Sequence, residues 1–206
     1  MKLKAQWIII TLLAFTLATL AAPKLVFEDN FDKDTGKWVS FSGDWFVEKG
    51  YLINEDINHT TSNVYCQVPQ KGKIVTYEYK ILMLDTIVEY GPLCGLHFYV
   101  EDPEERGESY FFYQAKPFLI KMVKTGPTEA ILNPLGDVIA GTAEVGKEYV
   151  LKAIFDTKKG EITLFINGEE VAVYEVLEDL DPGEYISFRT NRTTVKIDYI
   201  KVWVEN

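Results

Sequence analysis

The chain has 206 residues, a length typical of one domain, and hydrophobic residues make up 47% of it. Its formal net charge is −10, and the first 22 residues contain two lysines and no acidic residue, so the remainder is more acidic still. This charge argues against binding nucleic acid or an anionic lipid surface, since both need basic patches. Sugars and proteins stay open as partners.

The N-terminus reads "MKLKAQWIIITLLAFTLATLAAP". A short basic start, an apolar run and then small residues are the layout of a secretory signal peptide, here residues 1–21, followed by one domain over 22–206. The alternative is an uncleaved membrane anchor, although the apolar run is short for a span of about 20 residues. Either way we expect a protein that is secreted or held in the cell envelope, with no membrane partner once the signal is cleaved.

The remaining segments are short apolar-alternating runs divided by Gly, Pro, Asn and Asp, and helix signals are nearly absent. This pattern predicts an all-β sandwich of two antiparallel sheets. The predicted strands are 25–30, 44–48, 51–54, 62–68, 73–83, 93–100, 108–115, 118–124, 149–155, 161–166, 170–174, 184–189 and 194–204. Asn167-Gly168 is expected to form a two-residue hairpin turn, because both residues tolerate positive φ. The charged segment 101–108 is interpreted as a solvated loop.

The two cysteines, Cys66 and Cys94, both lie in apolar predicted strands. In an oxidising compartment they can form one disulfide, and the alternative is two buried free thiols. The chain has two histidines and no Cys-x-x-Cys pair, so a zinc site is not expected.

The last predicted strand changes phase in the middle. Val195 and Ile197 are apolar on one parity, whereas Ile200 and Val202 are apolar on the other. A strand with one buried face keeps its parity, so a β-bulge is expected at Asp198.

Several of these segments resemble the concanavalin A-like lectin/glucanase superfamily, which includes the family 16 glucanases. The resemblance lies in the acid-x-Phe element at Asp29 to Phe31, in Trp38, in the "WFVEKGYL" stretch from Trp45, and in "IDYIKVWV" near the end. The middle of the chain is similar to laminin-G-like and 3-keto-disaccharide-hydrolase-like sandwiches. The resemblance covers nearly all of residues 25–204 and implies a jelly roll.

The resemblance also implies a structural Ca²⁺ where the first and last strands meet. Carried over by position, its ligands are the carbonyls of Asn30 and Gly50 and the carboxylate of Asp198. Backbone carbonyls with a carboxylate suit a hard cation. The alternative is an edge bulge in which Asp198 is exposed or pairs with Lys196 or Lys201.

The carboxylates of a family 16 hydrolase, an E-x-D-x-x-E pattern on one strand, are missing. Glu78, Asp85 and Glu89 have the wrong spacing. We therefore predict no catalytic residues. The enzyme alternative that survives is a glycoside hydrolase or lyase that uses His97 with Tyr and Arg groups.

Strand alternation suggests a sugar-binding face instead. In "CGLHFYV", His97 and Tyr99 alternate with apolar residues, and in "ISFRTN" Arg189 points away from the predicted core. Tyr110 and Phe112 share one face of the next strand, and Phe111 and Tyr113 share the other. The predicted ligand-binding set is His97, Tyr99, Tyr110, Phe112 and Arg189, because aromatic rings stack on sugars and polar side chains bind hydroxyls.

The alternative for these residues is an ordinary strand composition, with Arg189 paired to a surface carboxylate. The function predicted from the sequence is therefore a secreted, non-catalytic domain that binds a polysaccharide or glycan. An extracellular structural or self-assembling subunit is the second candidate, and an enzyme of the same superfamily is the third.

Overall fold

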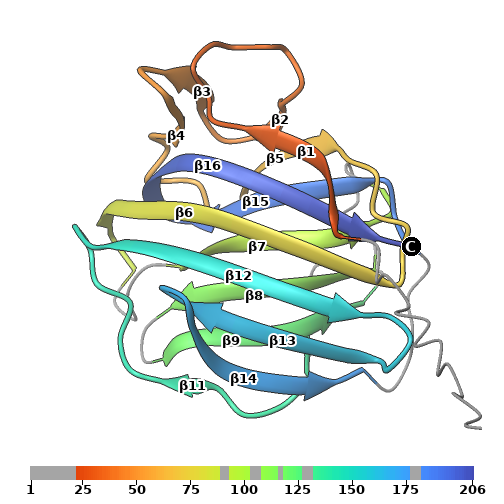
Figure 1. Ribbon diagram of the computed structural model, residues 1–206. Helices are drawn as coiled ribbons and strands as arrows, with labels where there is room; N and C mark the ends of the chain where they lie inside the picture. Colours follow the sequence, from red (N-terminus) through yellow and green to blue (C-terminus); the bar gives the residue numbers. More distant parts are fainter. Residues whose placement is uncertain (1–21, 89–92, 103–107, 116–117, 127–131, 177–181) are drawn as a thin grey trace, which may run out of the picture.

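The structure is a computed structural model that describes residues 22–88, 93–102, 108–115, 118–126, 132–176 and 182–206 (Figure 1). The predicted signal peptide and the central part of the 101–108 segment lie outside these residues. The described residues contain strands and no helix. Accordingly, this part of the chain has no helix of the length and hydrophobicity needed to cross a membrane.

The strands follow one another along the chain with short connections. They are β1 (Lys24–Asp29), β2 (Val39–Ser42), β3 (Trp45–Glu48), β4 (Tyr51–Asn54), β5 (Ser62–Gln67), β6 (Ile74–Thr86), β7 (Leu93–Val100), β8 (Ser109–Ala115), β9 (Phe118–Thr125), β10 (Leu132–Pro134), β11 (Ile139–Ala140), β12 (Glu148–Asp156), β13 (Glu161–Ile166), β14 (Glu169–Glu175), β15 (Tyr185–Asn191) and β16 (Thr193–Glu205).

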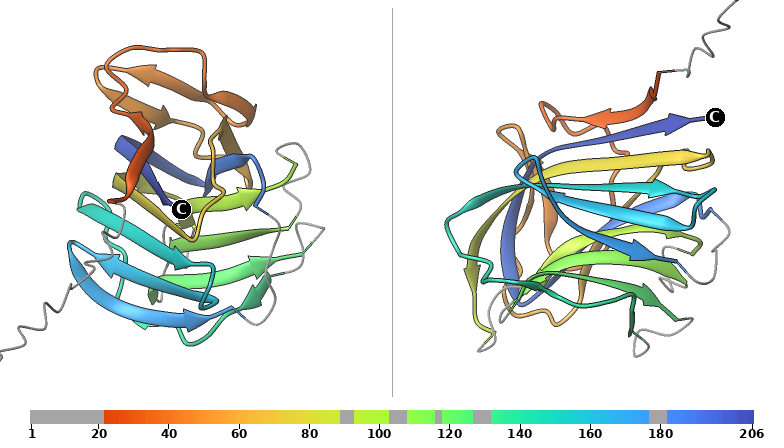
Figure 2. Two further views of the ribbon diagram at one scale, coloured as in Figure 1. Left: turned by 45° about the vertical axis from the view of Figure 1, so that its right-hand side comes forward. Right: turned by 60° about the horizontal axis from the view of Figure 1, so that its bottom comes forward.

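These strands form two antiparallel sheets that pack face to face (Figures 1 and 2). Sheet A has the order β14-β13-β12-β6-β16-β4-β3, with β1 also paired to β16. Sheet B has the order β10-β9-β8-β7-β15-β5-β2, with β11 also paired to β9. The fold is therefore an all-β sandwich, as the sequence predicts.

The core lies between the sheets and is rich in aromatic residues. Tyr77 of sheet A stacks on Phe98 of sheet B, with ring centroids 4.5 Å apart. Tyr79 contacts Phe188 and Phe112 across the same gap, at 5.2 and 5.4 Å. Alternate residues of the strands supply this layer, because side chains of a strand point to opposite faces in turn.

All the predicted strands are present, and β2, β10 and β11 are additional. The Asn167-Gly168 turn is confirmed, since both residues have positive φ (52° and 86°) between β13 and β14.

The predicted β-bulge in β16 is confirmed. Ile197 pairs with Ile81 and Tyr199 pairs with Lys80, which leaves Asp198 as the additional residue. Side chains before and after the bulge therefore both reach the core, although their parity differs.

The cysteines are free, so the disulfide prediction is corrected. Cys66 on β5 is level with Ile186 of β15, and Cys94 on β7 is level with Thr190 of the same strand. The thiols are thus two strand spacings apart, about 9.6 Å, and displaced by four residues along the strand, about 13 Å. A disulfide needs Cα atoms roughly 4.4–6.8 Å apart.

Candidate functional site

The outer face of sheet B, the face turned away from the core, carries two parallel rows of side chains. The strand register defines both rows. The first row is Tyr65, Ser187, His97, Phe111 and Val123. The second row is Asn63, Arg189, Gly95, Tyr113 and Lys121. Polar and aromatic residues are therefore interleaved across five neighbouring strands.

His97 lies in the buried part of this face. Its ring stacks flat on Phe111, with centroids 3.8 Å apart and planes 3° apart, and Phe111 stacks on Tyr113 at 4.6 Å. The His97 Nδ1 atom is 2.9 Å from Ser109 Oγ, which in turn is 2.9 Å from Thr125 Oγ1. Because His97 and Phe111 are almost completely buried, we interpret them as a rigid support under the face.

Three residues of the predicted ligand-binding set lie in the core instead. Tyr110 and Phe112 pack between the sheets on the inner face of β8. Tyr99 also turns inward, because its φ of 59° interrupts the alternation of β7. Its ring lies 5.3 Å from Phe155 of sheet A. The predicted platform is corrected accordingly: of its five members, His97 and Arg189 are on the outer face, and only Arg189 is partly exposed.

One accessible part of the face lies along β5 and β15. Tyr65 and Tyr185 are both partly exposed and meet edge to face, with centroids 6.1 Å apart and planes 84° apart. Neither tyrosine belongs to the ligand-binding set predicted from the sequence. Their parity could have indicated them, since Tyr65 alternates with buried Val64 and Cys66 along β5.

Arg189 borders this tyrosine pair. Its guanidinium reaches over β7 to within 6.0 Å of the Phe111 ring centroid. Gly95, directly opposite Arg189, offers no side chain to block this path. A Cβ at Gly95 would collide with the carbonyl oxygen of Phe112, so close packing of β7 on β8 requires glycine there.

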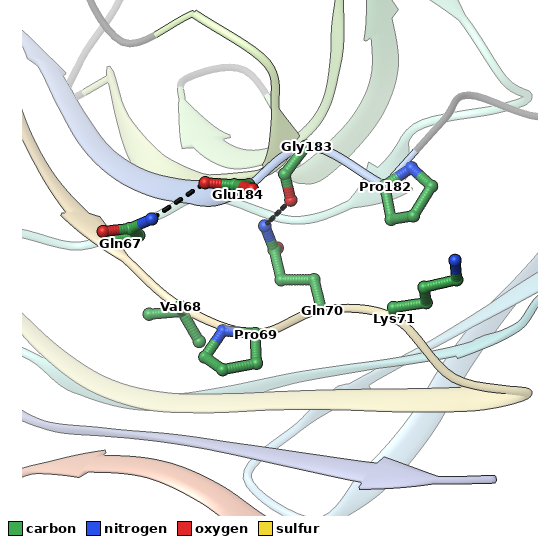
Figure 3. A pocket seen from close by; sticks show the side chains of 8 residues that line it. All are labelled: Gln67, Val68, Pro69, Gln70, Lys71, Pro182, Gly183 and Glu184. Carbon is green, nitrogen blue, oxygen red and sulfur yellow. Dashed lines mark hydrogen bonds between the residues drawn. The ribbon is translucent and has the colours of Figure 1, made fainter.

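A pocket of about 770 Å³ lies at the end of β5, next to this face (Figure 3). It is lined by Gln67, Val68, Pro69, Gln70, Lys71, Pro182, Gly183 and Glu184. On its wall, the Gln67 amide donates a 2.8 Å hydrogen bond to the Glu184 carboxylate. This volume is within the usual range of ligand pockets, roughly 300–1,000 Å³.

Gln70 holds the two sides of the pocket together. Its Nε2 donates to the carbonyls of Gly183 (2.6 Å) and Tyr185 (2.9 Å). Its Oε1 accepts from Tyr77 Oη (2.9 Å) and from the backbone N–H of Tyr99 (3.0 Å). All four hydrogen-bonding positions of this buried amide are thus used, and the last of them fixes the left-handed turn at Tyr99.

The predicted calcium residues come to one junction of sheet A. β4 pairs with β16 up to Ile197 and β1 pairs with it from Ile200, so Gly50 and Asn30 flank the bulge at Asp198. The Asn30 side chain, however, donates to Asp32. The predicted ligands thus supply one carboxylate and two backbone segments.

The cation at this junction is a lysine ammonium. Lys80 Nζ is 3.0 Å from Asp198 Oδ2 and 3.1 Å from Glu148 Oε2. Hydrogen bonds to these carboxylates, that to Asp198 first, raise the pKa of Lys80. Calcium takes six to eight oxygen ligands, and Lys80 would lie against it. In the described part of the chain, no three or more His, Cys, Asp or Glu side chains cluster to hold a metal. The donor set therefore fits a salt bridge better than a calcium ion.

Neither a family model nor a curated protein sequence matches the chain. Solved structures do match it. A carbohydrate-binding module, CBM66, from Bacillus subtilis is similar at a TM-score of 0.60 and 15% identity, over 79% of this chain and 92% of the module. A Lotus tetragonolobus seed lectin is similar at a TM-score of 0.59 and 13% identity, over 88% of this chain and 100% of the lectin. A Bacillus licheniformis β-glucanase is similar at a TM-score of 0.61 and 9% identity, over 88% of this chain and 98% of the enzyme.

At these identities the similarity concerns the fold, which the order of strands and the two-sheet packing support independently. The chain has the concanavalin A-like jelly-roll fold.

Proposed function

We propose that this chain is a non-catalytic carbohydrate-binding domain that acts outside the cytoplasm. One observation carries the proposal: the partly exposed pair Tyr65 and Tyr185 lies on the outer face of sheet B between a guanidinium and a polar pocket. Lectins and carbohydrate-binding modules among the structures with the same fold support it.

The chemistry of this strip suits a sugar. Tyrosine rings offer apolar faces to the C–H groups of a pyranose, and their hydroxyls can hydrogen-bond at the edge. Arg189 and Asn63 at one end, and Gln67 and Glu184 at the other, supply the donors and acceptors that fix orientation. Tyr185 and Arg189 are four residues apart on β15, about 13 Å, which favours an oligosaccharide over a single sugar unit.

The test is retention of the purified domain in native gels that contain a panel of soluble polysaccharides, with analysis of each mixture for released sugar. Retention on one glycan class without product supports the proposal. Tyr185→Ala should weaken that binding about tenfold, a loss of about 1.4 kcal/mol.

The matched control is Tyr51→Ala. Tyr51 is a partly exposed tyrosine on sheet A, where it lies 5.4 Å from Lys196. This variant should bind like the wild type. Equal weakening of glycan binding by both substitutions would contradict the assignment of the site. Released sugar would show that the domain is an enzyme and would contradict the proposal of a non-catalytic domain.

Assembly is the second candidate, because the edge strand β2 is unusually apolar. Val39 and Phe41 are 49% and 51% exposed there, and the strand contains no charged residue or proline. Such an edge can pair with another chain. A chain that binds no glycan in the panel and sediments as an oligomer, which Phe41→Lys converts to a monomer, would support this function instead.

A further inference from the structure

Arg189 on β15 makes no ion pair with the described residues, in contrast to Lys80, Lys152 and Lys201 of sheet A. Six lysines lie within 4.0 Å of a carboxylate: Lys49, Lys80, Lys147, Lys152, Lys159 and Lys201. For Arg189, no Asp or Glu of the described residues lies within that distance. Its contacts are the Phe111 ring and a long 3.4 Å hydrogen bond from Nη2 to Thr61 Oγ1. The surface-carboxylate alternative for Arg189 is thus not supported.

The environment of Arg189 makes this lack of an anion costly. The residue is only partly exposed, and its Nε atom is buried with no hydrogen-bond partner. Asn63 lies directly opposite on β5, and its Oδ1 atom is also buried and unpartnered. A buried charge is normally paired, and each unsatisfied group of this kind costs about 1–3 kcal/mol.

We propose that the glycan bound on this face carries an anionic group, a carboxylate or a sulfate ester, that pairs with Arg189. This inference rests on the proposed function and names the class of its ligand. The planar guanidinium presents parallel N–H groups that match two oxygens of such an anion. Asn63, directly opposite on β5, borders the same site.

The net charge of −10 opposes any anionic ligand, but this opposition is weak at the site. At physiological ionic strength, exposed charges are screened beyond about 8 Å, whereas a partly buried ion pair is screened much less. A hydrogen bond to a charged group contributes about 1.5–3 kcal/mol. The local pair with Arg189 therefore outweighs the distant acidic residues.

The test compares two matched pairs of polymers: polygalacturonate with its carboxyl-reduced form, and dextran sulfate with dextran. The wild type should bind at least one acidic polymer more tightly than its neutral counterpart. The polymer pair in which this occurs distinguishes carboxylate from sulfate. Arg189→Gln should weaken binding of that acidic polymer about 10- to 100-fold, and Arg189→Lys should recover only part of it.

Arg192→Gln is the control, because it removes the same charge at an exposed arginine three residues away; it should leave binding unchanged. Melting curves establish that each variant is folded.

Equal affinity for the acidic and neutral members of both pairs, or equal losses in Arg189→Gln and Arg192→Gln, would overturn the inference. Binding only to a neutral glycan of the wider panel would also overturn it, while the proposed function would stand. Binding to no glycan at all would overturn both.

Discussion

Replacing Gln70 with leucine should strongly destabilise the fold and deform the pocket. The substitution removes four hydrogen bonds at a position that is only 3% exposed. It leaves two carbonyls, the Tyr77 hydroxyl and the Tyr99 amide without their partner. At about 1 kcal/mol for each net bond, and more where a buried group stays unsatisfied, we expect a loss of about 3–5 kcal/mol in the free energy of unfolding.

Urea denaturation followed by tryptophan fluorescence measures this loss. The dependence of the free energy of unfolding on urea concentration should be the same in wild type and variant, as two-state unfolding requires. Gln67→Leu is the matched control on the same segment, because that exposed amide makes one bond to the exposed Glu184. It should change stability by less than about 0.5 kcal/mol. If Gln70→Leu cost less than about 1 kcal/mol, the amide would not be the element that holds the pocket together.

Three further predictions follow from the buried thiols, the Lys80 junction and Gly95. Burial raises the pKa of Cys66 to about 12 and also raises that of Cys94. Both thiols should resist an aromatic disulfide reagent at pH 8 until urea unfolds the chain, and a reducing agent should not change the melting temperature; rapid labelling of the native protein would contradict their placement. The raised pKa stabilises the fold below the unfolded value near 9, so stability should fall as pH rises from 9 toward 12. The melting temperature in calcium should equal that in EDTA, because Lys80 already neutralises Asp198. A melting temperature several degrees higher in calcium would support the calcium site instead. Gly95→Ala should lower stability by several kcal/mol or prevent folding, because its Cβ collides with backbone of β8; circular dichroism melting close to the wild type would refute this steric constraint.

The fold could be predicted because its signals are local. Alternation and turn residues located the long strands, and the change of parity between Ile197 and Ile200 located the bulge. The acid-x-Phe element also has a local reason in the structure. Asp29 accepts hydrogen bonds from the Phe31 amide and from Trp38 Nε1, and so holds the left-handed turn at Phe31.

The missed strands are short or at edges. β10 and β11 have three and two residues, too few to show alternation. β2 alternates in the sequence, but its apolar residues point to solvent. It therefore has no buried face of the kind that alternation indicates.

The site could be predicted only in part, because it depends on how strands lie beside one another. The parity rule failed at Tyr99, where the backbone N–H donates a hydrogen bond to Gln70, 29 positions earlier, and so holds a left-handed backbone. It also could not choose between the two faces of β8, since both are aromatic. Arg189 was identified because it lies in a regular strand whose inner residues, Ile186 and Phe188, are clearly apolar.

Side-chain footprinting by hydroxyl radicals, with and without a saturating glycan identified by the binding screen, tests directly whether the outer face of sheet B binds the glycan. We expect oxidation of Tyr65 and Tyr185 on sheet B to fall in the complex, while oxidation of Tyr51 on sheet A is unchanged. Protection of Tyr51 with no change at Tyr65 and Tyr185 would contradict a site on sheet B, because the glycan would then lie on the other sheet.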